Sequence, residues 1–172
     1  MKQNKINKKF VYLISPNKIP NINFYNDLAL ILSSKKISFF QLRLKKETNS
    51  NKLIIGKKIK KICNKYKVKF LINDDPLLAK KLNADGCHLG QKDMDLIKAR
   101  KILKNKIIGV TCHNSINLAK KAINAGADYL AFGAFYSSKT KKIKYKASLK
   151  ILKLAKKITN IPIVAIGGIN QS

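Results

Sequence analysis

Acidic residues, cysteine and histidine are all scarce in this sequence. Only 8 of the 172 residues are acidic, against 37 lysines and arginines, so the formal net charge is +29. The odd number of cysteines (Cys63, Cys87 and Cys112) and the absence of a C-x-x-C pair argue against a disulfide framework. His88 and His113 show no recognisable metal-ligand spacing. We therefore expect buried free thiols in a reducing cytoplasm and no histidine-based metal site.

Long hydrophobic runs are also missing. The apolar stretch at residues 10–14 follows a basic segment, but it stops at Ser15 and Pro16. That length is too short for a signal-peptide core or a membrane span. The sequence therefore predicts a cytoplasmic protein that does not enter the membrane.

Arginine is nearly absent, and this bears on the meaning of the positive charge. Arg43 and Arg100 are the only arginines, and the lysines are scattered over most of the chain. No basic arm is present, nor the mixture of aromatic and basic residues that stacks nucleic-acid bases. We interpret the lysines as a solvated surface that reflects composition, with a nucleic-acid-binding face as the alternative. Such a field would still speed the encounter with anionic substrates.

Short apolar runs alternate with amphipathic, lysine-rich stretches, such as the helical pattern at 51–66. Seven of these runs predict strands, at residues 10–15, 38–44, 69–74, 86–90, 107–112, 129–135 and 161–167. The alternation predicts βαβ units and a parallel sheet. Polar clusters after many strands, and no G-x-G-x-x-G turn after the first, favour a TIM (βα)8 barrel over an open doubly wound sheet. We expect one α/β barrel domain over residues 1–172, with the eighth unit missing at the C-terminus.

Two similar segments, 82–86 and 125–129, each end a helix and begin a strand. They place Asp85 and Asp128 at strand beginnings, which form the stability end of a barrel. We predict a structural role for both residues.

Gln41, Arg43 and Lys45 are spaced by two along a predicted strand. On a strand they would share one face, with Leu42 and Leu44 turned towards the covering helices. Burying three polar side chains inside a barrel costs free energy unless an anionic partner is present, and arginine suits bidentate binding of phosphate. The pattern predicts a phosphate-binding face, with an exposed edge strand as the alternative.

Carboxylates follow the third and fourth predicted strands. Asn73 and Asp74 end the third strand, and Asp93 lies just beyond the fourth. Neighbouring strand ends of a barrel are close in space, so Asp74 and Asp93 could share Mg²⁺, which takes one or two carboxylates plus phosphate oxygens. Helix capping is the alternative for each residue alone. Together with the nearby cations, they predict a metal–diphosphate site.

The sixth and seventh predicted strands run into segments suited to anions. Residues 133–142 mix small hydroxyl residues with lysines, which also fits a solvated loop. Gly167 and Gly168 end the seventh strand, where glycine lets backbone N–H groups approach a phosphate. Barrels often bind phosphate with these late loops.

The ordered set of motifs resembles the thiamine-phosphate synthase family. The resemblance rests on residues 12–14, 41–45, 72–74, 84–91 with Asp93, 109–113, 128–129, 133–141 and 162–169. It implies a transferase of thiamine biosynthesis that joins hydroxymethylpyrimidine diphosphate to a thiazole phosphate and releases diphosphate. The implied mechanism is dissociative: diphosphate departs, and the thiazole nitrogen attacks a pyrimidine methylene cation. A homodimer is also suggested.

The same resemblance assigns roles to individual residues. It implies that the pyrimidine diphosphate is held by Gln41, Arg43, Lys45, Asn73 and Lys141. Asp74 and Asp93 would bind Mg²⁺, and Ser138, Thr140 and Gly168 would hold the thiazole phosphate. Arg43, Lys45, Thr111 and Lys141 are the implied catalytic residues, and Thr111 is also implied to bind substrate, next to the pyrimidine.

The chain also departs from the family pattern. Thr111 replaces a usual serine, and Ser138 replaces a usual threonine. The missing eighth unit would leave the thiazole-phosphate half of the site incomplete and the barrel edges uncovered. The alternatives are a thiazole tautomerase-like barrel, which handles no diphosphate, and a truncated inactive or basic binding protein. Arg43, Lys45, Asp74 and Asp93 favour the synthase, since a tautomerase has no leaving diphosphate to stabilise.

Overall fold

Seven parallel strands and six helices alternate along the chain in the computed structural model, which describes residues 10–137 and 145–169. The strands are β1 (Val11–Ile14), β2 (Ile37–Leu42), β3 (Lys69–Asn73), β4 (Gly86–Leu89), β5 (Ile107–His113), β6 (Tyr129–Phe132) and β7 (Ile163–Ala165). The helices are α1 (Asn23–Ser33), α2 (Asn49–Lys65), α3 (Pro76–Lys81), α4 (Leu96–Leu103), α5 (Ile116–Asn124) and α6 (Leu149–Ile158). All seven predicted strands are present.

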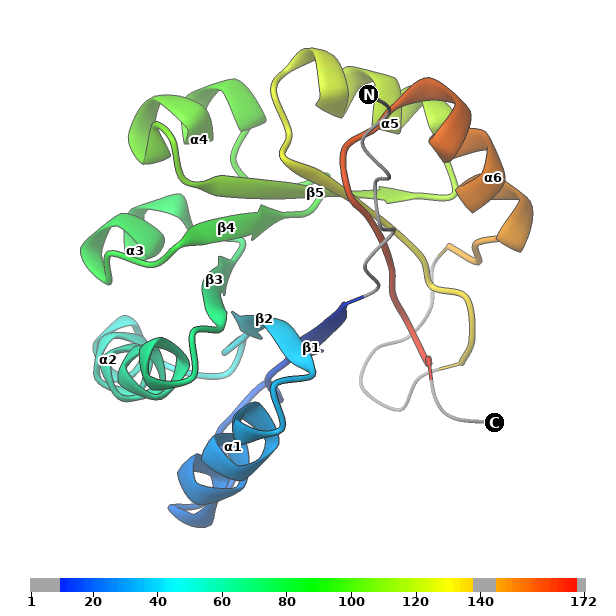
Figure 1. The fold of residues 1–172 in the computed structure, drawn as a ribbon. Coiled ribbons are helices and arrows are strands. Elements are labelled where there is room, and N and C mark those ends of the chain that lie inside the picture. The colour runs from blue at the N-terminus through cyan, green and yellow to red at the C-terminus, as the bar shows by residue number, and fades with distance from the viewer. Residues whose placement is uncertain (1–9, 138–144, 170–172) are drawn as a thin grey trace, which may run out of the picture.

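The strands form one sheet in sequence order, β1-β2-β3-β4-β5-β6-β7, with every neighbouring pair parallel. Figure 1 shows the sheet curving around a centre, with the helices on its outer side. This is the architecture of a TIM barrel in which seven strands are in place, as predicted. Within the described residues, β1 and β7 are the two edges of the sheet.

The two faces of the sheet have different compositions because side chains alternate along each strand. The outward side chains are apolar and pack against the helices in one buried core; examples are Phe40, Leu42, Phe70, Ile108 and Phe132. The inward positions hold a different set, which is polar over several neighbouring strands: Tyr12, Gln41, His88, Thr111 and Tyr129. The helices are thus held by ordinary hydrophobic packing, while polar groups gather inside the barrel.

Polar side chains cap several helices at their N-termini. Thr48 accepts a hydrogen bond from Asn51 N at the start of α2, and Ser115 accepts one from Leu118 N at the start of α5. Asp75 and Asp95 do the same for α3 and α4. Helix capping is therefore the role of Asp75, and the adjacent Asp74 remains the candidate metal ligand.

Asp85 and Asp128 have the structural role that was predicted for them. Asp85 Oδ2 accepts a hydrogen bond from Phe70 N at 2.9 Å, and Asp128 Oδ2 accepts one from Ile108 N at 2.7 Å. Each carboxylate thus ties the start of its strand to the preceding strand. Arg100 strengthens the second tie, because its guanidinium reaches Asp128 at 2.6 Å and also donates to the carbonyl oxygens of residues 104, 106 and 126.

Several strand limits differ from the sequence prediction. β2 ends at Leu42 instead of continuing to residue 44, because Arg43 N donates to the side chain of Ser15 and the chain then turns towards α2. β6 and β7 are also shorter than predicted, although the segments after them remain in contact through a hydrogen bond from Phe135 N to Ile166 O.

The three cysteines are free and buried, as predicted. Burial raises the pKa of the Cys63 and Cys112 thiols to about 12. Among the described residues, no helix is long and apolar enough to cross a membrane.

Candidate active site

The ends of β2, β3 and β4 bring the predicted cationic and acidic side chains together. Arg43 and Lys45 follow β2, Asp74 follows β3, and Asp93 lies in the loop after β4. Because the strands are parallel and adjacent in this order, their carboxyl ends share one rim of the barrel. Lys45 Nζ lies 2.8 Å from Asp74 Oδ2, which joins the end of β2 to that of β3.

The carboxyl groups of Asp74 and Asp93 lie close enough to shift each other's pKa, and a hydrogen bond between them requires that one of the two be protonated. Asp93 Oδ2 also accepts a hydrogen bond from Gly90 N at 2.7 Å, and Asp74 N donates to His88 O at 2.8 Å. Asp74 has a φ of 65°, in the left-handed region that is uncommon for a residue other than glycine. Such strained positions cluster at functional sites.

The pKa values of the two carboxyl groups are shifted in opposite directions. Burial disfavours ionisation of Asp74, but hydrogen bonds from Lys45, Asp93 and Asn73 outweigh it, and its pKa lies below the usual value. Burial and the hydrogen bond to Asp74 raise the pKa of Asp93. Two carboxyl groups in contact thus favour sharing one proton, and a bound cation can take the place of that proton.

The pair fits a hard divalent cation that also binds substrate. Within the described ranges, no group of three or more His, Cys, Asp or Glu side chains could hold a metal by itself. Mg²⁺ does not need such a cage, since it is commonly bound by one or two carboxylates together with water and substrate phosphates. The two oxygen-donor side chains, with Lys45 beside them, match that kind of site.

Arg43 and Lys45 lie in the loop after β2, so the prediction that they share a strand face with Gln41 was wrong. Leu42 and Leu44 are nevertheless buried against the helices, as that alternation predicted. Arg43 is half-buried, and its Nη1 donates to Asn17 Oδ1 in the loop after β1. Its guanidinium is therefore held at the same rim by a neighbouring loop.

Gln41 is buried inside the barrel and begins a chain of hydrogen bonds. Gln41 Nε2 contacts Tyr12 OH at 2.8 Å, and Tyr12 OH contacts Tyr129 OH at 2.8 Å. Tyr129 OH contacts His88 Nδ1 at 2.7 Å, and His88 Nε2 contacts Thr111 Oγ1 at 2.8 Å. The buried amide of Gln41 is thus hydrogen-bonded to a tyrosine, and not to the anion that the sequence suggested. This chain, named here the interior relay, links five strands.

Three members of the interior relay were not predicted as site residues: Tyr12, His88 and Tyr129. One signal was present in the sequence, because Gly109 lies in β5 opposite Tyr129 in β6. A Cβ at position 109 would collide with the Tyr129 ring, so the glycine makes room for that ring. Strand order alone did not show that this ring would reach His88.

Gly168 lies beside the loop that follows β6. Its φ is 66°, and a Cβ there would collide with the backbone oxygens of Tyr136 and Ser137. Tyr136 N also donates to Gly167 O at 3.0 Å, so the loops after β6 and β7 are in contact. The predicted site residues Ser138, Thr140 and Lys141 lie outside the described residues.

Two clefts lie at opposite ends of the strands. A cleft of about 100 Å³ lies beside Lys45, Asn73 and Asp74. A larger one of about 470 Å³ lies at the other end of the strands, where Lys60, Lys69 and Lys106 line it. Those three lysines bond to Leu82 O, Asp85 and Ala84 O respectively, so they stabilise the ends of helices and strands.

Comparison with known proteins identifies the family. The family model described as thiamine monophosphate synthase matches residues 11–172. The thiamine-phosphate synthase of Pelagibacter ubique (strain HTCC1062) is 89% identical over 172 residues, which are 100% of this chain and 83% of that protein. The chain belongs to the thiamine-phosphate synthase family. It has the activity of that family, a transferase activity in thiamine biosynthesis, as the motifs predicted.

More distant members of the thiamine-phosphate synthase family agree. The thiamine-phosphate synthase of Nitrosomonas eutropha is 43% identical over 161 residues, which are 93% of this chain and 76% of that protein. The solved structure of thiamine phosphate pyrophosphorylase from Pyrococcus furiosus has a TM-score of 0.80 at 29% identity. It covers 94% of this chain and 76% of that one. The predicted barrel and the predicted family are both confirmed.

Proposed function

We propose that the chain condenses hydroxymethylpyrimidine diphosphate with a thiazole phosphate at the rim formed by β2, β3 and β4, with Mg²⁺ bound by Asp74 and Asp93. The contact between these two carboxylates, with Lys45 at 2.8 Å from Asp74, carries the proposal. Carboxylates in contact repel one another unless a proton or a cation lies between them. The site is thus prepared for a positive charge.

Arg43, Lys45 and Asn73 would bind the diphosphate of the pyrimidine substrate. Arg43 provides a planar guanidinium suited to phosphate oxygens, and Lys45 provides a compact positive charge at the same rim of the barrel. Mg²⁺ would neutralise the negative charge that develops on the departing diphosphate. The same cationic side chains stabilise that charge, because they are held in place before the reaction and need no rearrangement.

The remaining predicted residues divide between the two substrates. Gln41 and Thr111, at the two ends of the interior relay, would hold the pyrimidine ring inside the barrel. Lys141 would add a further positive charge to the diphosphate. Ser138, Thr140 and Gly168 would hold the thiazole phosphate, and the contact of Gly168 with the loop after β6 supports this grouping.

The test is an assay of the purified protein with both substrates, with and without Mg²⁺. We expect thiamine phosphate and diphosphate to form in equal amounts, and a chelator to stop the reaction. The Asp93→Ala variant should lose the activity while remaining folded. No turnover by a folded protein, together with salt-sensitive RNA binding, would instead support a basic binding protein.

A homodimer, suggested by family resemblance, is a separate prediction. Light scattering on the purified protein should give twice the mass of the chain, 19.4 kDa. The mass of a single chain would refute it.

A further inference from the structure

The interior relay joins Gln41 and Thr111, two predicted substrate-binding residues, through three side chains with no assigned role. Gln41, Tyr129 and His88 are 2%, 4% and 6% exposed, whereas Tyr12 and Thr111 are half-buried. The relay therefore begins at a buried amide and ends at Thr111, a residue that is partly exposed. Within the described residues, none of its side-chain polar atoms is buried without a hydrogen-bond partner.

The hydrogen atoms available to the relay allow one consistent direction from the Gln41 amide. Gln41 Nε2 is a donor, so Tyr12 accepts from it and has its own hydroxyl hydrogen to give to Tyr129. Tyr129 then donates to His88 Nδ1. A neutral imidazole carries one hydrogen, which must lie on Nε2 and be donated to Thr111 Oγ1.

Thr111 is therefore left with its own hydroxyl hydrogen, which no other member of the relay requires. A hydroxyl has one hydrogen to donate, and the lone pair of Thr111 that faces His88 is already engaged. If the relay ran in the opposite direction, Thr111 would donate to His88 and offer only lone pairs to a ligand. The direction of the relay thus decides whether position 111 presents a donor or an acceptor.

We propose that Tyr12, Tyr129 and His88 are positioning residues that hold the Thr111 hydroxyl as a hydrogen-bond donor to an acceptor atom of the pyrimidine substrate. This inference rests on the proposed function, because it requires that substrate to bind next to Thr111. The ring packing supports the arrangement: the His88 and Tyr129 rings stack with centroids 5.6 Å apart, and the Tyr12 and Tyr129 centroids are 5.8 Å apart. The three rings therefore hold one another's orientation.

The first experiment determines the tautomer of His88 in the wild-type protein by long-range ¹H–¹⁵N correlation. The chain has two histidines, so the His113→Gln variant assigns the signals. We expect hydrogen on Nε2 and none on Nδ1. Hydrogen on Nδ1 would overturn the proposal, whatever the activity of the protein. This measurement requires no substrate and no change within the relay.

The second experiment breaks the relay at its centre with Tyr129→Phe. Removing this hydroxyl leaves His88 Nδ1 without its donor, so the Nε2 tautomer should lose its preference. We expect kcat/KM for the pyrimidine substrate to fall about 10- to 100-fold, the effect of one misdirected buried hydrogen bond. The KM for the thiazole phosphate should remain within about twofold.

Controls separate positioning from folding. Tyr25→Phe on α1 removes a half-buried tyrosine hydroxyl outside the relay and should leave both constants unchanged. Thr111→Ser keeps a hydroxyl at this position and should therefore lose much less activity than Thr111→Val, which should lose as much as Tyr129→Phe. Full activity of Tyr129→Phe would overturn the proposed positioning role alone, whereas an inactive wild-type protein would overturn the proposed function. Should Tyr129→Phe fail to fold, the wild-type tautomer and the Thr111 pair still decide the question.

Discussion

Replacing Asp93 by asparagine tests the proposed metal site most directly. The variant keeps an oxygen that can accept the hydrogen bond from Gly90 N but removes one of the two carboxylate charges. At an effective dielectric constant of about 20, a unit charge and a divalent cation about 4 Å apart interact by about 8 kcal/mol. Because Asp93 is half-exposed and asparagine keeps an oxygen ligand, we expect about a quarter of that energy to be lost. About 2 kcal/mol corresponds to Mg²⁺ binding that is roughly 30-fold weaker.

The assay is a Mg²⁺ activation curve measured at saturating concentrations of both substrates. Asp95→Asn is the matched control, because Asp95 lies two residues away and its loss changes the net charge equally. Its carboxylate caps α4 through Ile97 N at 2.9 Å, and asparagine caps helices as well as aspartate does. The control should therefore keep the wild-type Mg²⁺ requirement.

Stability gives an independent check of the same argument. Burial and the neighbouring Asp74 raise the pKa of Asp93, so an ionised Asp93 reduces the free energy of unfolding above its usual titration range. In a chelator at neutral pH, Asp93→Asn should therefore unfold at the same temperature as the wild type or at a higher one. An unchanged Mg²⁺ requirement in Asp93→Asn, or an equal change in Asp95→Asn, would refute the two-carboxylate site.

Three further predictions concern other parts of the molecule. Arg43→Lys should lower kcat/KM about tenfold or more in steady-state assays, because lysine lacks the fork that binds two phosphate oxygens; an unchanged value would contradict the role of Arg43. Arg100→Lys should lower the free energy of unfolding in urea by about 2 kcal/mol, since the guanidinium holds Asp128 and three carbonyl groups, and activity per folded molecule should not change. Burial raises the pKa of Cys63 to about 12, so this thiol should react far more slowly with iodoacetamide at pH 8 in the native than in the urea-unfolded protein; equal rates would show that it is accessible.

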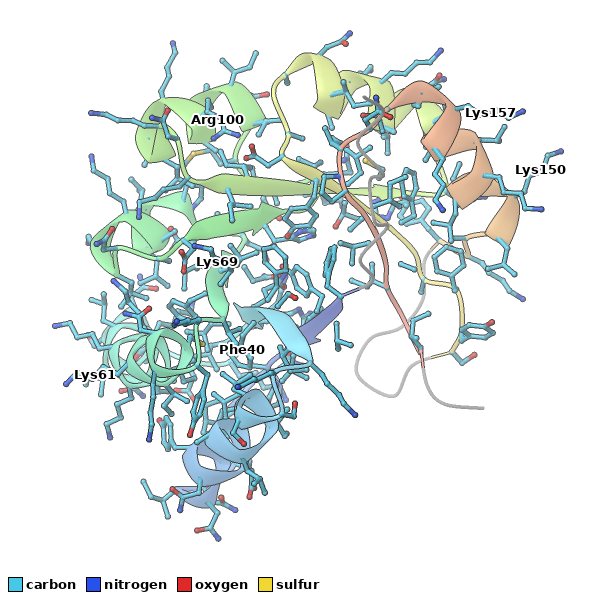
Figure 2. All side chains as sticks on the ribbon, viewed as in Figure 1. Phe40, Lys61, Lys69, Arg100, Lys150 and Lys157 are labelled. Atoms are coloured by element: carbon cyan, nitrogen blue, oxygen red, sulfur yellow. The ribbon has the colours of Figure 1, made fainter. Side chains whose placement is uncertain are left out.

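The positions of the lysines explain why the net charge was a poor guide to function. In Figure 2, Lys61 on α2 and Lys150 and Lys157 on α6 extend outward from the barrel. These three side chains are exposed, as expected for a solvated lysine surface. The cations proposed to act on substrate, Arg43 and Lys45, are instead held at the rim by Asn17 and Asp74. Position in the fold, and not the number of lysines, distinguishes them.

The sequence by itself determined the alternation of strands and helices and the family. These features are local or ordered along the chain: apolar runs mark the strands, and motifs such as residues 41–45 keep their order. The rim could also be predicted in outline, because parallel neighbouring strands must end side by side. Asp74 and Asp93 are accordingly in contact.

Only the tertiary structure decided how the interior is satisfied and where each strand stops. The end of β2 depends on a hydrogen bond from Arg43 N to Ser15, 28 positions earlier in the chain. The interior relay needs side chains from five strands, and its link between Tyr12 and Tyr129 spans 117 positions. Hydrogen bonds of this kind depend on the curvature of the sheet, which brings β1 and β6 face to face across the barrel. No local pattern in the sequence shows that Tyr12 and Tyr129 approach one another.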